Sequence, residues 1–115
     1  MARIMVVDDS PADLQILKAI LQKGGHEVIE VQSGQDSIAK ARAEKPDAIV
    51  MDVVMPGVNG FQATRSISKD PDTSNIPIIV VSAKNQETDR VWALRQGAKE
   101  YVVKPVKDEI GRAHV

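Results

Sequence analysis

The stretch DAIVMD, residues 47–52, is a short apolar run closed by an acidic residue at each end. Its length and composition predict a buried strand. Pro56-Gly57 and Asn59-Gly60 follow within a few residues and break the pattern, so the strand ends at Asp52. A carboxylate at the carboxyl end of such a strand indicates a ligand site, because open α/β sheets bind ligands at that edge.

Two other apolar runs end in polar groups in the same way. Residues 4–7 lead into Asp8 and Asp9, and residues 78–81 lead into Ser82. Helical patterns lie between the strand-like runs and are bounded by capping residues and breakers. The predicted strands are residues 4–7, 27–31, 47–52, 78–81 and 101–103, and the predicted helices are residues 10–24, 33–45, 59–68 and 86–96.

This alternation predicts an α/β fold, a doubly wound five-stranded parallel sheet with helices on both faces. After the fifth strand, Asp108 can cap another helix, but Ile110 is its only core anchor and Gly111 lowers its helix propensity. We therefore expect the fifth helix to be truncated or absent. An apolar patch left uncovered there would favour self-association.

Length and composition exclude several classes of function. A chain of 115 residues has room for one buried core, so we expect one domain. The net charge of -1 provides no bulk attraction to nucleic acid or to an anionic membrane. Cysteine is absent, which excludes disulfides and thiolate metal sites. Because no apolar run approaches membrane-spanning length, the expected location is the cytoplasm.

The polar groups at the strand ends suit phosphoryl chemistry. Asp8 and Asp9 supply hard oxygen ligands for Mg²⁺, which can bridge Asp52 to an incoming phosphate. Without a metal, the three carboxylates would repel one another and titrate at a higher pH. Lys104 follows the last strand and can pair with Asp52 or with a phosphoryl oxygen, while Ser82 can donate a hydrogen bond to another oxygen.

These motifs carry a resemblance to a known family. They are Asp8-Asp9, Asp52 with Met55-Pro56-Gly57 and Asn59-Gly60, Ser82-Ala83, Tyr101 and Lys104-Pro105. In them the chain resembles the receiver domain of two-component response regulators. The resemblance implies a flavodoxin-like fold with strand order 2-1-3-4-5 and a single receiver domain over residues 1–115. It also implies that a histidine kinase phosphorylates Asp52 in the presence of Mg²⁺.

The resemblance assigns further roles to single residues. It implies that the backbone carbonyl of Val54 is a metal ligand, that the Lys104–Pro105 peptide bond is cis, and that Ser82 and Tyr101 form a switch. The signal would leave through the surface of the predicted helix 86–96 and strand 101–103. It would pass to a downstream protein that the sequence does not name.

Two segments narrow the resemblance. GFQATR at residues 60–65 and QETDRVW at residues 86–92 look like the single-domain regulators of type IV pilus twitching motility. The corresponding expectation is a role in pilus-based motility or in chemotaxis-like signalling. On this interpretation the protein is a phospho-accepting signalling domain, not a dedicated enzyme, and it assists its own phosphorylation and dephosphorylation.

Other interpretations of the same residues stay open. A single aspartate after a strand is usually a helix cap or a turn residue, and only the combined set at three strand ends favours chemistry. A phosphohydrolase with an aspartyl nucleophile uses similar groups but usually needs an inserted cap domain. A nucleotide- or flavin-binding module needs a phosphate cradle, and the loop at residues 8–11 is acidic and lacks glycine. A phosphorylation-independent interaction domain is the third alternative.

Overall fold

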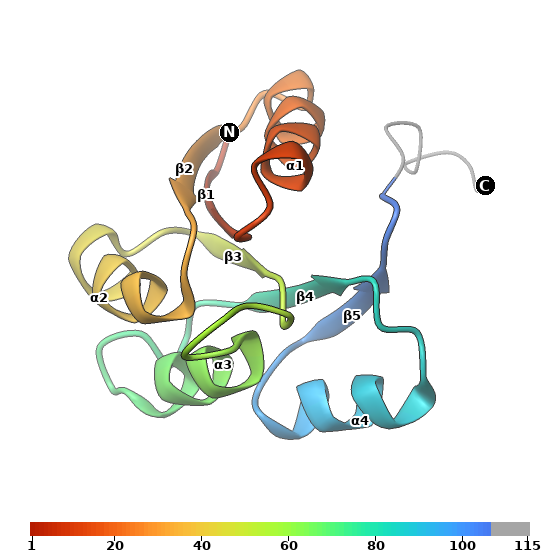
Figure 1. Ribbon diagram of the computed structural model, residues 1–115. Helices are drawn as coiled ribbons and strands as arrows, with labels where there is room; N and C mark the ends of the chain where they lie inside the picture. Colours follow the sequence, from red (N-terminus) through yellow and green to blue (C-terminus); the bar gives the residue numbers. More distant parts are fainter. Residues whose placement is uncertain (107–115) are drawn as a thin grey trace.

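The structure, a computed structural model, describes residues 1–106 of the chain. Strands and helices alternate along these residues (Figure 1). The strands are β1 (Arg3–Val7), β2 (Glu27–Val31), β3 (Ala48–Met51), β4 (Ile78–Ser82) and β5 (Glu100–Val103), and the helices are α1 (Pro11–Lys23), α2 (Gly34–Glu44), α3 (Gly60–Lys69) and α4 (Glu87–Arg95). The predicted truncated or absent fifth helix, after Asp108, lies outside the described residues.

The five strands form one parallel sheet in the order β2-β1-β3-β4-β5. This order confirms the predicted doubly wound, flavodoxin-like arrangement. The chain runs outward from β1 to β2 and then returns across β1 to β3, so the direction of winding changes between β1 and β3. Val7 pairs with Val31 on one side and with Met51 on the other, which brings the carboxyl ends of β1, β2 and β3 level. Ligand sites of such sheets lie at this switch point.

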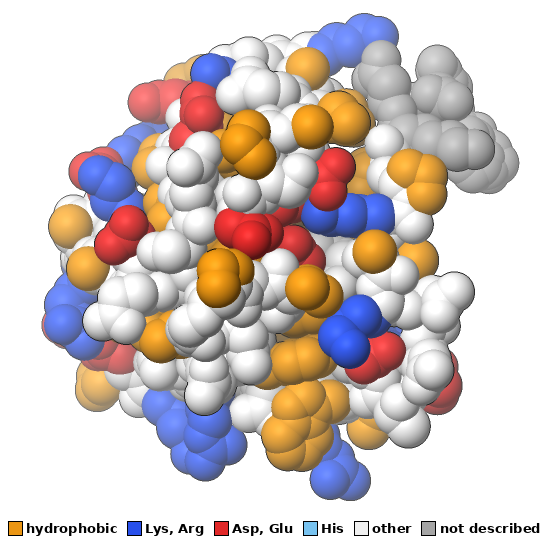
Figure 2. All heavy atoms as spheres, in the orientation of Figure 1, with side chains coloured by type: hydrophobic (Ala, Val, Ile, Leu, Met, Phe, Trp, Pro, Cys, Tyr) orange, Lys and Arg blue, Asp and Glu red, His pale blue; other side chains and the backbone are white. Residues whose placement is uncertain are grey.

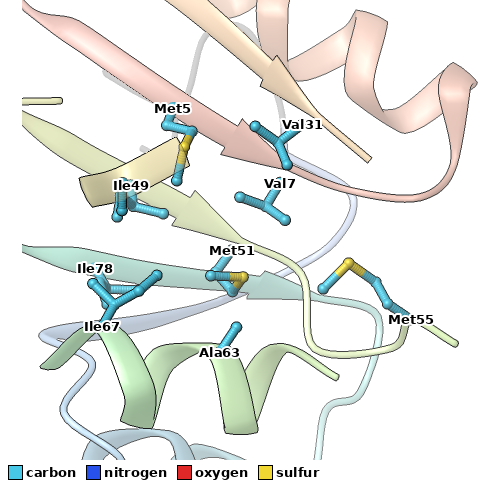
Figure 3. Close-up of a cluster of buried hydrophobic side chains, with 10 residues drawn as sticks. Met5, Val7, Val31, Ile49, Met51, Met55, Ala63, Ile67 and Ile78 are labelled. Atoms are coloured by element: carbon cyan, nitrogen blue, oxygen red, sulfur yellow. The ribbon is translucent and has the colours of Figure 1, made fainter. Parts of the chain in front are cut away.

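Alternation of side chains along β1 divides the core into two layers. Met5 and Val7 pack in a cluster that α2 and α3 cover, where Ala63 and Ile67 of α3 meet the sheet (Figure 3). Val6 points to the opposite face and packs with residues of α1. Figure 1 shows this division, with α1 on one side of the sheet and α2, α3 and α4 on the other. The sheet is therefore covered on both faces, as the alternating pattern predicted.

The predicted helix starts are confirmed. Ser10 and Ser33 are the N-caps of α1 and α2, and each hydroxyl oxygen accepts a hydrogen bond from the backbone N–H three residues later. Asn59 caps α3 in a reciprocal arrangement with Gln62, whose side chain accepts the N–H of Asn59 at 3.0 Å. These caps satisfy N–H groups that have no partner within the helix. They also fix where α1 and α3 begin, next to the ends of β1 and β3.

Candidate functional site

Three carboxylates meet at the carboxyl ends of β1 and β3. One oxygen from each of Asp8, Asp9 and Asp52 lies within 4.8 Å of the other two. The backbone holds them there because the N–H of Asp52 donates to the carbonyl of Val7 at 2.9 Å, one residue beyond the end of β3. Asp8 is fully buried, Asp52 is nearly so, and Asp9 is exposed. Figure 2 shows acidic side chains gathered beside a basic one near the middle of this face.

The environment of Asp52 favours a cation. Burial raises the pKa of Asp52 above its ordinary value, the charge of Lys104 offsets part of that rise, and the charge of Asp8 adds to it. The N–H of Val54 donates to the Oδ1 atom of Asp52 at 3.3 Å, which places Val54 next to the acceptor carboxylate. Three carboxylates this close, with hard oxygen donors, fit a divalent ion such as Mg²⁺.

Lys104 joins the cluster from the end of β5. Its Nζ atom donates to the Oδ2 atom of Asp8 at 2.7 Å and to the Oδ2 atom of Asp13 at 2.8 Å, and lies 3.6 Å from the Oδ2 atom of Asp52. Burial alone would lower the pKa of Lys104, but the hydrogen bonds to Asp13 and Asp8 and the charge of Asp52 outweigh burial and raise this pKa. Lys104 therefore carries a positive charge at neutral pH. The Lys104–Pro105 peptide bond is cis.

Ser82 and Tyr101 both form hydrogen bonds with the backbone of Lys84, in the loop between β4 and α4. The buried hydroxyl oxygen of Ser82 accepts the backbone N–H of Lys84 at 3.3 Å. The hydroxyl group of Tyr101 donates to the backbone carbonyl of Lys84 at 2.7 Å. The two residues expected to move together are thus connected through the backbone of one residue, although their side chains come from neighbouring strands.

Comparison with known proteins identifies this arrangement. A family model described as the response regulator receiver domain matches residues 4–115. The chain belongs to this family. The receiver domain is therefore a module of phosphorylation-based, two-component signalling, as the resemblance of its motifs predicted.

Individual relatives cover most of this receiver domain. Protein PilH of Pseudomonas aeruginosa is 57% identical over 109 residues, which are 95% of this chain and 90% of PilH. Chemotaxis protein CheY of Thermotoga maritima is 40% identical over 90% of this chain and 85% of CheY. The solved receiver domain of sensor histidine kinase PA1611 from Pseudomonas aeruginosa has a magnesium ion coordinated in its active site cleft. It superimposes with a TM-score of 0.87 at 32% identity, covering 97% of this chain and 93% of that one.

None of the helices that the structure describes in residues 1–106 is both long enough and apolar enough to cross a membrane.

The sequence did not indicate two residues that contact the site of this receiver domain. Asp13 lies in the first turn of α1, where an acidic residue is usually explained by the helix dipole alone. Lys84 lies in an irregular loop with no pattern to mark it. Its position in the chain could have indicated Asp13, because the first turn of α1 lies at the same edge of the sheet as Lys104, which follows β5.

The raised pKa of Asp52 leads to a prediction about stability. An ionised carboxylate whose pKa is higher in the folded than in the unfolded protein destabilises the fold. This penalty is absent below the unfolded-state pKa of about 3.9 and is complete above the folded-state pKa. In metal-free buffer at neutral pH, Asp52→Asn should therefore unfold at a temperature a few degrees higher than the wild type. The difference should vanish as the pH falls below about 4.

Circular dichroism melts with a chelator present, at neutral and at acidic pH, measure both effects. An Asp52→Asn variant that melts at a lower temperature than the wild type at neutral pH would show that Lys104 compensates fully for the burial of Asp52.

Proposed function

We propose that this receiver domain accepts a phosphoryl group on Asp52 from a histidine kinase. Asp8, Asp9, Asp52 and the backbone carbonyl of Val54 would hold the Mg²⁺ ion that this reaction requires. The observation that carries the proposal is the convergence of three carboxylates and Lys104 at the switch point of the sheet. The magnesium ion in the related PA1611 receiver domain supports the choice of metal.

The proposed reaction is the transfer of a phosphoryl group between two proteins. A carboxylate oxygen of Asp52 attacks the phosphorus atom of a phosphohistidine, the phosphorus–nitrogen bond breaks, and the imidazole leaves with the electron pair. The product is an acyl phosphate on Asp52. The bound metal supplies the positive charge that lets a carboxylate and a phosphate approach each other. Lys104 and Ser82 donate hydrogen bonds to the phosphoryl oxygens, and the same groups assist the later hydrolysis.

The proposed output passes through Ser82, Lys84 and Tyr101. When the hydroxyl of Ser82 turns toward a phosphoryl oxygen, it gives up the N–H of Lys84, which it holds in the structure. The loop at Lys84, whose carbonyl accepts the hydroxyl of Tyr101, is then free to shift, and the position of Tyr101 changes with it. The phosphoryl group thereby alters the surface of α4 and β5.

This surface has the composition of a protein contact. Trp92 is 50% exposed, and three further apolar side chains of α4 and β5 are exposed beside the basic residues of α4. These apolar side chains are Val91, Leu94 and Val103. We propose that a downstream protein binds here, in pilus-based motility or in chemotaxis-like signalling in the cytoplasm. The 57% identity to PilH supports the first of these pathways.

The predicted self-association remains separate from this proposal. The apolar groove that would favour it is about 360 Å³ in volume and lies between α1 and the chain after β5, next to Ile16, Leu17 and Val106. Residues 107–115, on which the prediction depends, lie outside the described residues. Self-association through this region stays a prediction.

The metal requirement provides the test of the proposed function. Wild-type protein treated with acetyl phosphate in Mg²⁺ should gain one phosphoryl group, and a chelator should prevent the reaction. Asp9→Ala removes a carboxylate oxygen of the cluster, so it should weaken Mg²⁺ binding by about 10-fold or more and reduce phosphorylation in parallel. Calorimetry measures the binding, and intact-mass spectrometry measures the phosphorylation.

The matched control is Asp36→Ala, which removes an exposed acidic residue outside the cluster. It should leave both measurements at wild-type values. Equal Mg²⁺ affinity in Asp9→Ala and in wild type would exclude the proposed ligand set.

A further inference from the structure

Asp13 has a carboxylate that its own helix does not use. It is the third residue of α1, and its N–H is held by the side chain of Ser10. At this position an acidic or amide side chain commonly reaches back to the N–H of the capping residue, as Gln62 does in α3 and Asp89 does in α4. In α1 the N–H of Ser10 instead donates to the Oδ1 atom of Asp8 at 2.9 Å. The carboxylate of Asp13 is therefore free to extend toward the site.

The partner of this carboxylate is Lys104. The two side chains meet at 2.8 Å, whereas Lys104 lies 3.6 Å from the carboxylate of Asp52. The side chain of Lys104 is only 14% exposed, so little water competes for it. Its two short hydrogen bonds go to Asp8 and Asp13, neither of which is the proposed phosphoryl acceptor. A hydrogen bond between two charged groups is roughly twice as strong as one between neutral groups.

We propose that Asp13 is a positioning residue that holds Lys104 in a resting position away from the phosphoryl group. Phosphorylation of Asp52 then requires Lys104 to exchange Asp13 for a phosphoryl oxygen. The inference rests on the proposed function, and it adds a residue that opposes the phosphorylated state. Asp13 itself touches neither Asp52 nor the phosphoryl group in this account, because it acts through Lys104.

The variant that tests the proposal is Asp13→Asn, which keeps the shape of the side chain and removes its charge. The probe is beryllofluoride, an analogue of the phosphoryl group, titrated in Mg²⁺ and followed by fluorine NMR. Releasing Lys104 should lower the beryllofluoride concentration for half saturation by about 3- to 10-fold. This range is below the full value of a charged hydrogen bond, since the side chain of Asp13 is 41% exposed. Asp13→Glu keeps the charge and should restore half saturation toward the wild-type value.

Asp36→Asn is the matched control. Asp36 occupies the same position in α2, behind the capping residue Ser33, and is exposed. It therefore reproduces the loss of a negative charge from the first turn of a helix without the contact to Lys104, and it should bind beryllofluoride as the wild type does. Thermal melts of both variants show that the fold is retained, and Asp13→Ser serves as a second uncharged variant.

Measuring the same substitution in a Lys104→Met variant separates positioning of Lys104 from direct repulsion of the anion by Asp13. If Asp13 acts through Lys104, then Asp13→Asn should change half saturation by less than about 2-fold when Lys104→Met is already present. Equal effects in both backgrounds would mean that the charge of Asp13 repels the anion directly, and this would overturn the proposal. The proposal would also be overturned if the wild type binds beryllofluoride and Asp13→Asn and Asp36→Asn reach half saturation at the same concentration. Failure of the wild type to bind beryllofluoride would instead refute the proposed function, and this inference with it.

Discussion

Replacing Asp52 with asparagine is expected to abolish phosphorylation of the protein by acetyl phosphate in Mg²⁺. An amide has neither the charge nor the nucleophilic oxygen that the transfer needs. Asp8 is not expected to take over, because it is fully buried and its Oδ2 atom is held by Lys104 at 2.7 Å, closer than Lys104 lies to Asp52. Intact-mass spectrometry should therefore detect one added phosphoryl group on the wild type and none on Asp52→Asn.

The control for this experiment is Asp47, an aspartate at the amino end of β3, opposite Asp52. Asp47 is exposed and accepts the backbone N–H of Arg3 at 2.8 Å, far from the carboxyl edge of the sheet. Asp47→Asn should be phosphorylated as fully as the wild type. A phosphoryl group retained by Asp52→Asn would show that another carboxylate is the acceptor.

Replacing Gly60 with alanine is expected to destabilise the protein by about 3 kcal/mol or more. Gly60 is the first residue of α3, and a Cβ atom there would lie 2.5 Å from the Cα atom of Val53 and closer still to the carbonyl oxygen of Asp52. Both contacts are with backbone, which cannot rotate away as a side chain can. The start of α3 or the chain after β3 must shift, and the position of Asp52 shifts with it.

The measurements are chemical denaturation and phosphorylation of Gly60→Ala, both of which should be impaired. The matched variant is Gly24→Ala, at the end of α1, where φ is -81° and an added Cβ meets no atom closer than 3.4 Å. Gly24→Ala should change the free energy of unfolding by less than about 1 kcal/mol. Wild-type stability in Gly60→Ala would mean that α3 can move away from Asp52 at little cost.

The fold could be predicted from local patterns because those patterns and the tertiary structure agree. The apolar run ending at Asp52 became β3, and the capping residues Ser10, Ser33 and Asn59 begin the helices where they were expected. The strand order followed from the family resemblance and the sheet confirms it. Each strand end lies within one residue of its predicted bound, and the small differences arise because hydrogen bonding to a neighbouring strand decides where pairing stops.

The details of the site depended on distances that a linear pattern does not contain. The sequence indicated Asp8, Asp9, Asp52 and Lys104 because each follows a strand at the same edge. It did not indicate Asp13, since the contact with Lys104 depends on how α1 is rotated and on which N–H groups Asp8 has already engaged. It also did not indicate that Lys84 connects Ser82 with Tyr101, because those hydrogen bonds come from loop backbone.

Whether Asp52 is the phosphoryl acceptor is tested by locating the phosphoryl group in the wild-type protein. Borohydride reduces an aspartyl phosphate to homoserine, which is stable enough for peptide sequencing by tandem mass spectrometry. After treatment with acetyl phosphate and Mg²⁺, we expect homoserine at position 52 and unmodified aspartate at Asp8, Asp9 and Asp13. Homoserine at any of these three positions, or at none of the four, would contradict this expectation.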